Sequence, residues 1–367
     1  MRKIALFGGT FDPVHSDHIN IAKACIEALG FEEVWLIPNY LNPFKKHINS
    51  SIKDRLEMLE IVRKKYSFIR INEYEIRKQS RSFTYETINY LKSQPEYQGF
   101  QFSFVMGSDQ LDDFEKWDHF EELIKIIDFK VFLRSPEYNK EIVDKYNLQI
   151  FEFDNNHLSS TKIRNLVDVH LQDEDVNEYI NNNLLYLNDR LACKMDEKRF
   201  QHCLNVGMMA KRLAKIHNLD QQKALISGTL HDVTKRWTNE QHLTYLKKWL
   251  PPLLKEPKPV WHSFTGYLHL QKDWQIKDVE ILQAVFNHTV GSLEMSPLDM
   301  VVFCADKISE ERNYPGVEEI RAIVENDLVV GFKTLLKQQY EFALAKNGVE
   351  NIGTMLKASY DHWVQKE

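Results

Sequence analysis

This sequence contains few cysteines, no excess of positive charge and no long apolar run. The four cysteines (Cys25, Cys193, Cys203 and Cys304) are scattered without a C-x-x-C pair, which favours reduced thiols over a disulfide framework. Lys and Arg number 47 against 53 Asp and Glu, and this balance argues against a nucleic-acid or membrane surface. No apolar run approaches the roughly 20 residues that span a bilayer, and residues 1–7 reach glycine too early for a signal peptide. We therefore expect a soluble, cytoplasmic protein.

The first half of the 367 residues alternates short apolar runs with amphipathic stretches. Expected strands are 4–7, 34–37, 102–106 and 129–133, and expected helices between them are 19–29, 52–62 and 84–91. Strands separated by helices of this length indicate right-handed βαβ units around a parallel sheet. This pattern predicts a doubly wound α/β domain.

The pattern changes in the polar stretch 181–189. Apolar residues then recur at helical spacing over 200–216, 223–230, 278–286, 298–308 and 317–324, with no convincing strand. The segment 251–259 holds four of the 11 prolines and is expected to be a loop between helices. We expect two domains, an α/β domain over 1–188 and an all-α domain over 189–367.

Two glycines and two histidines follow the first expected strand within the string 8–18. Gly8 and Gly9 at a strand end let the backbone approach a phosphate and present its N–H groups. The next helix starts near Asp17, so its positive end faces the same space, and His15 and His18 can share its first turn. Ligands of open parallel sheets bind at the carboxyl ends of the strands. The string therefore predicts a phosphate site, the alternative being a glycine turn with two capping histidines.

Four segments in order carry a family resemblance. The string Gly-Gly-Thr-Phe-Asp-Pro-Val-His-Ser-Asp-His at 8–18 resembles the GGTFDPVHxGH signature of bacterial nicotinate mononucleotide adenylyltransferases. Residues 158–164, residues 106–109 with Trp117, and residues 82–87 are similar to further segments of that family. The resemblance implies a Rossmann-like sheet that transfers AMP from ATP to nicotinate or nicotinamide mononucleotide, releasing pyrophosphate with the help of Mg²⁺.

The resemblance also implies roles for individual residues. Charge that develops in the transition state would be neutralised by the catalytic residues His15, His18, Lys45 and Arg164. ATP would be bound by Gly8, Gly9, Thr10, Phe11, Gly107, Asp109, Arg134, Ser159, Ser160 and Thr161. The mononucleotide would be bound by Thr84, Tyr85 and Trp117, with the indole stacked on the pyridine ring. A core position for Trp117 and a surface salt bridge for Arg134 are the alternatives.

Two positions depart from the family pattern. The glycine between the two histidines is Asp17 here, so its carboxylate must point away from the triphosphate or bind magnesium. The family's Pro-His-Lys near the second strand is Pro43-Phe44-Lys45, which keeps the lysine and loses a histidine.

The second half contains His231-Asp232, with other metal-ligand types on or beside separate expected helices. The full set is His202, His231, Asp232, His262, His288 and Asp306. Imidazoles and carboxylates suit Fe, Mn, Co or Zn, and six such ligands suit two metal ions. A surface pair is the alternative for the dipeptide alone, and four other histidines (His170, His217, His242 and His269) are expected to be solvated or capping.

The order of these residues resembles the HD-domain superfamily of metal phosphohydrolases. The segments 198–202, 229–232, 287–291 and 305–309 are similar to the bacterial HD family that splits diadenosine tetraphosphate into two ADP. This resemblance implies two transition-metal ions, iron first, with manganese, cobalt or zinc as alternatives. Another nucleotide substrate (guanosine tetraphosphate or a nucleoside monophosphate) and a non-catalytic nucleotide sensor are the competing hypotheses. The preference for the acid or the amide, the oligomeric state and communication between the sites stay open.

Overall fold

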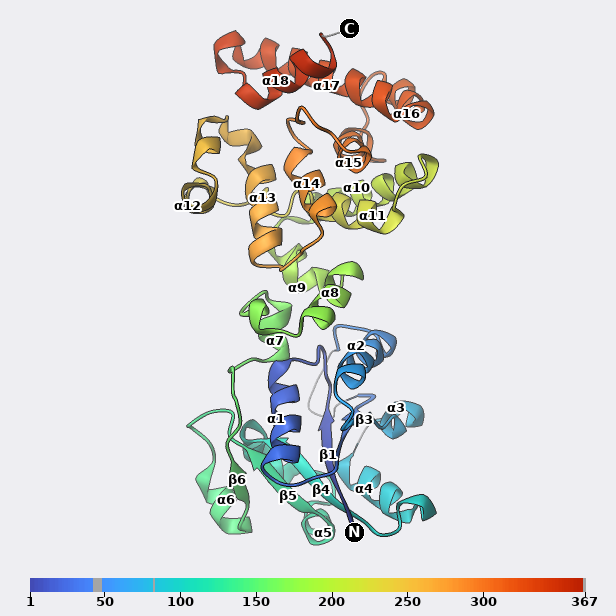
Figure 1. Ribbon diagram of the computed structural model, residues 1–367, viewed down its shortest axis with the longest axis vertical. Coiled ribbons are helices and arrows are strands. Elements are labelled where there is room, and N and C mark those ends of the chain that lie inside the picture. The colour runs from blue at the N-terminus through green and yellow to red at the C-terminus, as the bar shows by residue number, and fades with distance from the viewer. Residues whose placement is uncertain (42–47, 82, 366–367) are drawn as a thin grey trace. The chain divides into compact units, whose positions relative to one another are not determined.

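The computed structural model describes residues 1–41, 48–81 and 83–365 (Figure 1). The chain forms two compact units, Met1–Ile180 and Asn181–Glu367. The division falls within helix α8 (Glu174–Asn182), earlier than the end of the expected first domain at residue 188. Asn181 belongs to the second unit because its side-chain amide donates to the carbonyl of Trp274 (3.0 Å) and accepts from Arg190 (2.9 Å).

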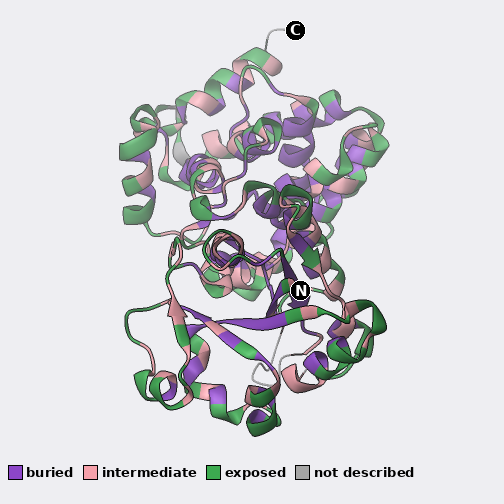
Figure 2. Cartoon of the chain, turned by 60° about the horizontal axis from the view of Figure 1, so that its bottom comes forward, coloured by how far each residue is buried: buried purple, intermediate pink, exposed green. Residues whose placement is uncertain are grey.

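The first unit is built on a six-stranded, wholly parallel sheet. Its strands are β1 (Arg2–Gly9), β2 (Glu33–Pro38), β3 (Ile69–Ile71), β4 (Phe100–Gly107), β5 (Asp128–Phe132) and β6 (Gln149–Phe151). They lie in the order β3-β2-β1-β4-β5-β6. The central strands are buried along most of their length, as Figure 2 shows in purple, which explains their continuous apolar runs. The predicted α/β fold is confirmed.

The strand order places the site. From β1 the chain winds outward through β2 to β3, then returns to β4 on the other side of β1. The carboxyl ends of β1 and β4, Gly9 and Gly107, therefore flank the switch point where ligands of open sheets bind. The helices of this unit are α1 (Ser16–Glu27), α2 (Ile52–Lys65), α3 (Tyr74–Lys78), α4 (Thr84–Ser93), α5 (Phe120–Ile126), α6 (Lys140–Tyr146) and α7 (Ser160–Arg164).

The second unit is helical, and residues 181–365 contain no strand. Its helices are α9 (Leu187–Arg190), α10 (Glu197–Ile216), α11 (Gln221–Leu230), α12 (Asn239–Trp249), α13 (Trp261–Lys272), α14 (Val279–Asn287), α15 (Pro297–Ile308), α16 (Val317–Asn326), α17 (Leu328–Asn347) and α18 (Thr354–Trp363). The all-α prediction is confirmed, and the proline-rich segment forms two short 3₁₀ turns between α12 and α13.

Small residues allow α10 and α11 to pack closely. A Cβ placed on Gly228 would lie 3.0 Å from the Cα of Gly207, and one on Gly207 would lie 2.1 Å from the hydroxyl of Thr229. Only hydrogen fits at these positions. The close approach brings His202 on α10 to the carboxyl end of α11, where His231 and Asp232 follow.

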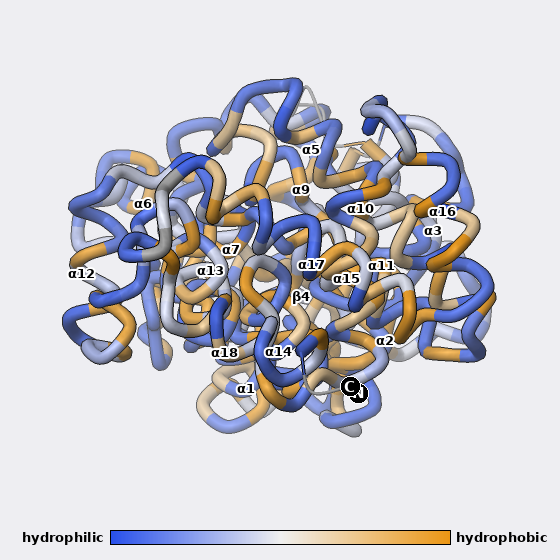
Figure 3. Tube along the Cα trace, turned by 90° about the horizontal axis from the view of Figure 1, so that it is seen from above, coloured by the Kyte–Doolittle hydropathy of each residue, from blue (hydrophilic) through white to orange (hydrophobic). Residues whose placement is uncertain are grey.

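No described helix is both long and apolar enough to cross a membrane. Along the tube in Figure 3, hydrophobic stretches are short and are interrupted by hydrophilic ones.

Candidate functional site

The first unit contains a cavity of about 620 Å³ at the carboxyl ends of β1 and β4. Most of the residues predicted from the motifs line this cavity together. They are Gly8, Gly9, Thr10, Phe11, His15, His18, Thr84, Gly107, Asp109, Trp117, Arg134, Ser159, Ser160, Thr161 and Arg164. Residues from five separate segments of the sequence therefore line one cavity. Lys45 lies outside the described residues.

The two histidines stand at the start of α1. The backbone N–H of His15 donates to Nδ1 of His18 (3.2 Å), and the two rings lie 3.7 Å apart. Burial and the nearby charge of Arg134 lower the pKa of His15 to about 3, so its ring is neutral at pH 7. Its side chain is 2% exposed, and Nδ1 has no hydrogen-bond partner among the described residues. A buried polar atom without a partner is unfavourable unless a ligand supplies one.

The short helix α7 is fixed to the loop that follows β1. Ser159 caps α7 by accepting from the N–H of Lys162 (3.1 Å), as expected for a residue that opens a helix. The Ser160 hydroxyl donates to the Pro13 carbonyl (2.9 Å), and the Arg164 guanidinium donates to the Asp12 carbonyl (2.6 Å). These contacts hold Ser159, Ser160 and Arg164 in the lining of the cavity that also contains the two histidines.

Arg134 and Asp109 form an ion pair in the cavity wall. Their side chains approach to 3.4 Å, and Arg134 also donates to the carbonyl of Leu158 (2.6 Å). Gly107 leaves room for this pair, because a Cβ there would lie 2.3 Å from the Asp109 carboxylate and 2.6 Å from Cδ of Arg134, and both side chains would have to move. The salt bridge weighed as an alternative for Arg134 therefore exists, but it lines the cavity.

The residues expected at the pyridine end are divided. Thr84 and Trp117 line the cavity, and Trp117 also packs edge-on against the core rings of Phe104 and Phe114 (5.7 and 5.6 Å between centroids). The core position weighed for Trp117 is therefore present, and the same residue lines the cavity; stacking on a pyridine ring stays a prediction. Tyr85 is not in the cavity lining; it stacks on His119 instead, with the centroids 4.7 Å apart.

Two charged residues of this site were missed in the sequence. Arg55 is fully buried and donates to the carbonyls of Thr10 (2.9 Å) and Asn39 (2.8 Å), which fixes the glycine loop to the end of β2. Glu75 is buried in the cavity wall and accepts from the hydroxyl of Thr87 (2.7 Å). Both lie in helices rich in charge, where a charged side chain is normally solvated, so the sequence carried no signal for them.

In the second unit the predicted metal ligands converge. His202 comes from α10, His262 from α13 and Asp306 from α15, while His231-Asp232 and His288 directly follow α11 and α14. Two overlapping groups have ligand atoms within 4.8 Å of one another: His202, His231 and Asp232, and Asp232, His262 and His288.

Asp232 belongs to both groups through different oxygen atoms. Its Oδ2 lies 3.4 Å from Nε2 of His231, while Oδ1 lies 3.1 Å from Nε2 of His262 and 3.7 Å from Nε2 of His288. Oδ1 of Asp306 lies 3.1 Å from Nε2 of His202 and 3.6 Å from Nε2 of His231, so it faces the first group. Burial opposes ionisation of both aspartates, but the surrounding histidines hold their pKa values well below the usual range.

The four histidines all turn Nε2 toward the centre. Nδ1 of His231, His262 and His288 lies 2.7–2.8 Å from the backbone carbonyls of Gly228, Pro259 and Val285, and Nδ1 of His202 lies 2.5 Å from Glu311. An Nδ1–H donor of this kind leaves the Nε2 lone pair for a metal ion. Nε2 of His231 is buried without a hydrogen-bond partner among the described residues. The arrangement therefore fits two metal ions that share Asp232.

Three cationic side chains that were not predicted from the sequence contact this centre. Arg199 contacts Oδ2 of Asp232 (2.7 Å), Lys235 contacts Nε2 of His262 (3.1 Å), and Arg312 contacts Oδ1 of Asp306 (3.0 Å). Each lies within a few positions of a ligand in the sequence, and that proximity was the signal available. Their positive charge suits a polyphosphate substrate.

Two of the four histidines that were expected to be solvated or capping, His242 and His217, have defined contacts. His242 is buried, and its Nδ1 contacts the hydroxyl of Thr265 (2.8 Å), so the expectation of a solvated or capping residue is wrong for it. It occupies an internal position of α12 on the face turned to α13, which its local sequence did not reveal. His217 follows α10 and contacts the carbonyl of Val324 (2.8 Å).

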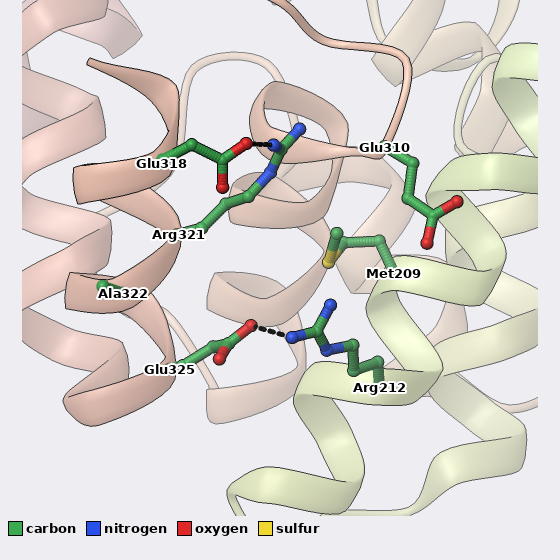
Figure 4. A pocket seen from close by; sticks show the side chains of 7 residues that line it. All are labelled: Met209, Arg212, Glu310, Glu318, Arg321, Ala322 and Glu325. Atoms are coloured by element: carbon green, nitrogen blue, oxygen red, sulfur yellow. Dashed lines mark hydrogen bonds and ion pairs between the residues drawn. The ribbon is translucent and has the colours of Figure 1, made fainter.

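The second unit contains a cavity of about 370 Å³ that none of the metal-site residues lines (Figure 4). It is lined by Met209, Arg212, Glu310, Glu318, Arg321, Ala322 and Glu325. Arg212 pairs with Glu325 (2.6 Å) and Arg321 pairs with Glu318, so both guanidinium groups are already neutralised.

Comparison with known proteins divides the chain at the same two regions. Residues 6–166 match the Cytidylyltransferase-like family, and residues 199–311 match the HD domain. A solved structure titled "predicted HD superfamily hydrolase involved in NAD metabolism" from Clostridium acetobutylicum aligns at 26% identity and a TM-score of 0.43, covering 51% of this chain and 96% of that one.

Two curated relatives match along nearly the whole chain. A Mycoplasma genitalium protein named "Probable nicotinate-nucleotide adenylyltransferase/Ap4A hydrolase" is 34% identical over 345 residues, which is 94% of this chain and 97% of the relative. A Mycoplasma pneumoniae protein of the same name is 30% identical over 353 residues, which is 93% of this chain and 100% of the relative.

Proposed function

The chain belongs to the family of these two-domain Mycoplasma proteins, and we propose that its first unit is a nicotinate mononucleotide adenylyltransferase and its second unit a metal-dependent diadenosine tetraphosphate hydrolase. The observation that carries the proposal is the match to both relatives, which extends over at least 93% of this chain and of each relative. A single shared domain would not extend so far. Scattered, unpaired cysteines and nucleotide substrates support a cytoplasmic location.

In the first reaction the phosphate of the mononucleotide attacks the α-phosphorus of ATP in line, and pyrophosphate leaves. No covalent intermediate is needed, so the protein aligns two polyanions and neutralises the charge that develops. Arg164 supplies positive charge, with Lys45 as a further proposed cation, and His15 and His18 stabilise the developing charge through hydrogen bonds from their rings. Mg²⁺ supplies charge neutralisation on the leaving phosphates when it is bound with ATP.

ATP and the mononucleotide occupy different ends of the cavity in this proposal. Gly8 to Phe11 and Gly107, with Ser159 to Thr161 and Arg134, bind the ATP phosphates through N–H groups, hydroxyls and positive charge. Asp109 accepts from a ribose hydroxyl, and Thr84 and Trp117 hold the pyridine ring. Tyr85 stacks on His119 and does not line the cavity, so a direct contact of Tyr85 with the mononucleotide is not part of this proposal.

In the second reaction His202, His231, Asp232 and Asp306 would hold one metal ion, and Asp232, His262 and His288 would hold the other. Nitrogen and oxygen donors without thiolate suit iron, with manganese, cobalt and zinc as alternatives. Two such ions supply Lewis-acid polarisation of a phosphoanhydride. Arg199, Lys235 and Arg312 bind the polyphosphate, and the buried histidines exclude bulk water from the centre.

One assay tests the first activity. The purified chain is incubated with ATP, Mg²⁺ and either nicotinate or nicotinamide mononucleotide, and the products are separated by chromatography. Formation of the nicotinate dinucleotide with pyrophosphate supports the proposal, and a faster reaction with the amide would reverse the proposed preference. Absence of both dinucleotides would refute it.

A second assay tests the hydrolase. Iron-loaded protein is given diadenosine tetraphosphate, guanosine tetraphosphate or a nucleoside monophosphate in parallel. Release of ADP alone from the first compound supports the proposal, because a symmetrical cut gives two identical products. Turnover of only another compound would assign a different substrate, and binding without turnover of any would make the unit a sensor.

A further inference from the structure

Asp17 is a buried carboxylate in the substrate cavity of the first unit. It lies between His15 and His18 in the first turn of α1, where the family signature has glycine, and it is 1% exposed. No described cationic side chain forms an ion pair with it, so its charge must be stabilised in another way. A buried ion without a counter-ion is strongly unfavourable unless hydrogen bonds compensate it.

Backbone N–H groups supply this compensation. Oδ1 of Asp17 accepts from the N–H of Asn156 (3.0 Å), and Oδ2 accepts from the N–H of Leu158 (2.7 Å). The carboxylate therefore turns toward the chain that precedes α7, which answers where an acidic side chain at this position points. The start of α1 adds a favourable partial positive charge.

The segment that Asp17 holds has no regular structure of its own. Residues 152–159 connect β6 to α7 and lie outside any strand or helix, so contacts from other elements fix their path. Arg134 donates to the Leu158 carbonyl (2.6 Å), and Asn20 donates to the Asp154 carbonyl (2.7 Å). Asp17 is distinguished among these contacts because it binds two peptide groups, one of them directly before Ser159.

We propose that Asp17 is a positioning residue for ATP binding: it holds Leu158 so that Ser159, Ser160 and Thr161 line the same cavity as His15 and His18. The proposal rests on the adenylyltransferase function proposed above. Asp17 replaces the conformational freedom of a glycine with a fixed link between α1 and the segment before α7. Because the link joins α1 to the segment directly before Ser159, its loss is expected to affect ATP and to leave binding at Thr84 and Trp117 unchanged.

The test compares Asp17→Asn with the wild-type chain. Asparagine offers one acceptor oxygen, and its NH₂ group would face one of the two backbone N–H donors, so the segment must move. A displacement of about 1 Å lowers the rate by about 100-fold, and we expect a loss of that order in kcat/KM for ATP. Calorimetric titration should show weaker ATP binding and unchanged binding of nicotinate mononucleotide. Hydrolysis by the second unit should not change.

Asp54→Asn is the matched control, since Asp54 also lies in the first turn of a helix in this unit and accepts from a backbone N–H (Ser51, 3.3 Å). It should lower the melting temperature without a selective effect on ATP. Asp17→Gly removes the carboxylate without adding an opposing donor and should also weaken ATP binding. Wild-type ATP binding in both Asp17 variants, or an equal loss for both substrates, would overturn the proposal. If the wild-type chain makes no dinucleotide, the proposed activity fails, while the ATP titration still tests Asp17.

Discussion

Replacement of Asp232 by asparagine is expected to remove metal from both positions of the HD centre. Its two carboxylate oxygens face different histidines, at 3.4 Å from His231 on one side and 3.1 Å from His262 on the other. Asp306 faces only the group that contains His202 and His231. The two aspartates therefore differ in role: Asp232 contacts histidines of both groups, whereas Asp306 contacts histidines of one group.

The expected magnitudes follow from this geometry. A chain with the full ligand set binds about two metal ions, Asp232→Asn should bind far fewer than two, and Asp306→Asn should keep about one. Asp232→Asn also leaves Arg199 without its carboxylate at 2.7 Å. That charge-assisted contact is partly buried, so its loss in metal-free protein should be about 1–2 kcal/mol. A change of this size lowers the melting temperature of a domain of similar length by about 2–8 °C.

Elemental analysis of both variants after iron loading gives the metal content, and release of ADP gives the activity. Asp232→Asn should show no measurable hydrolysis, while Asp306→Asn, which keeps one ion, should retain trace turnover. Dinucleotide synthesis should be unchanged in both variants and serves as the control for folding of the first unit. Two tightly bound ions and full hydrolysis in Asp232→Asn would refute the shared-ligand assignment.

Three further predictions follow from the two sites. His18→Ala should lower dinucleotide synthesis by about 10²–10³-fold through lost charge stabilisation while hydrolysis persists, and steady-state rates that keep more than about a tenth of the wild-type value would contradict its role. Dialysis against a chelator followed by Mg²⁺ should restore synthesis but not hydrolysis, because imidazole ligands select transition metals; return of both activities with Mg²⁺ alone would exclude the proposed centre. Glu311→Gln should weaken metal binding by about 10–100-fold, since Glu311 contacts Nδ1 of His202 at 2.5 Å and orients its ring. Glu310→Gln is the matched control, because Glu310 lines the separate cavity. Equal metal retention in the two variants would show that Glu311 has no such role.

Local patterns were sufficient for many of the larger elements. The buried strands β1, β2, β4 and β5 carry continuous apolar runs, and helices α10, α11, α14, α15 and α16 carry helical spacing, so both fold classes followed from the sequence. Helices α12 and α13 were not predicted. The strands β3 and β6 were not predicted. Each has only three residues and lies at an edge of the sheet, so neither contains enough residues to show a period.

Motif residues were predictable where the chemistry itself requires them. Glycines at the end of β1, the histidines at the start of α1 and the six metal-ligand candidates are residue types that phosphate or metal binding commonly uses, and the structure brings each set together. Tyr85 shows the limit of this reasoning, because a residue adjacent to a cavity-lining one points elsewhere when a neighbouring ring, here His119, offers it a stacking surface.

The sequence by itself determined the two fold classes and the residue types that gather at each site. Only the tertiary structure decided how those residues are supported, because the supporting contacts join distant parts of the chain. Asp17 meets Leu158 across 141 positions, Arg55 meets Thr10 across 45, and Glu311 meets His202 across 109. A hydrogen bond between such partners depends on where the sheet and helices place them, and no local periodicity records that placement.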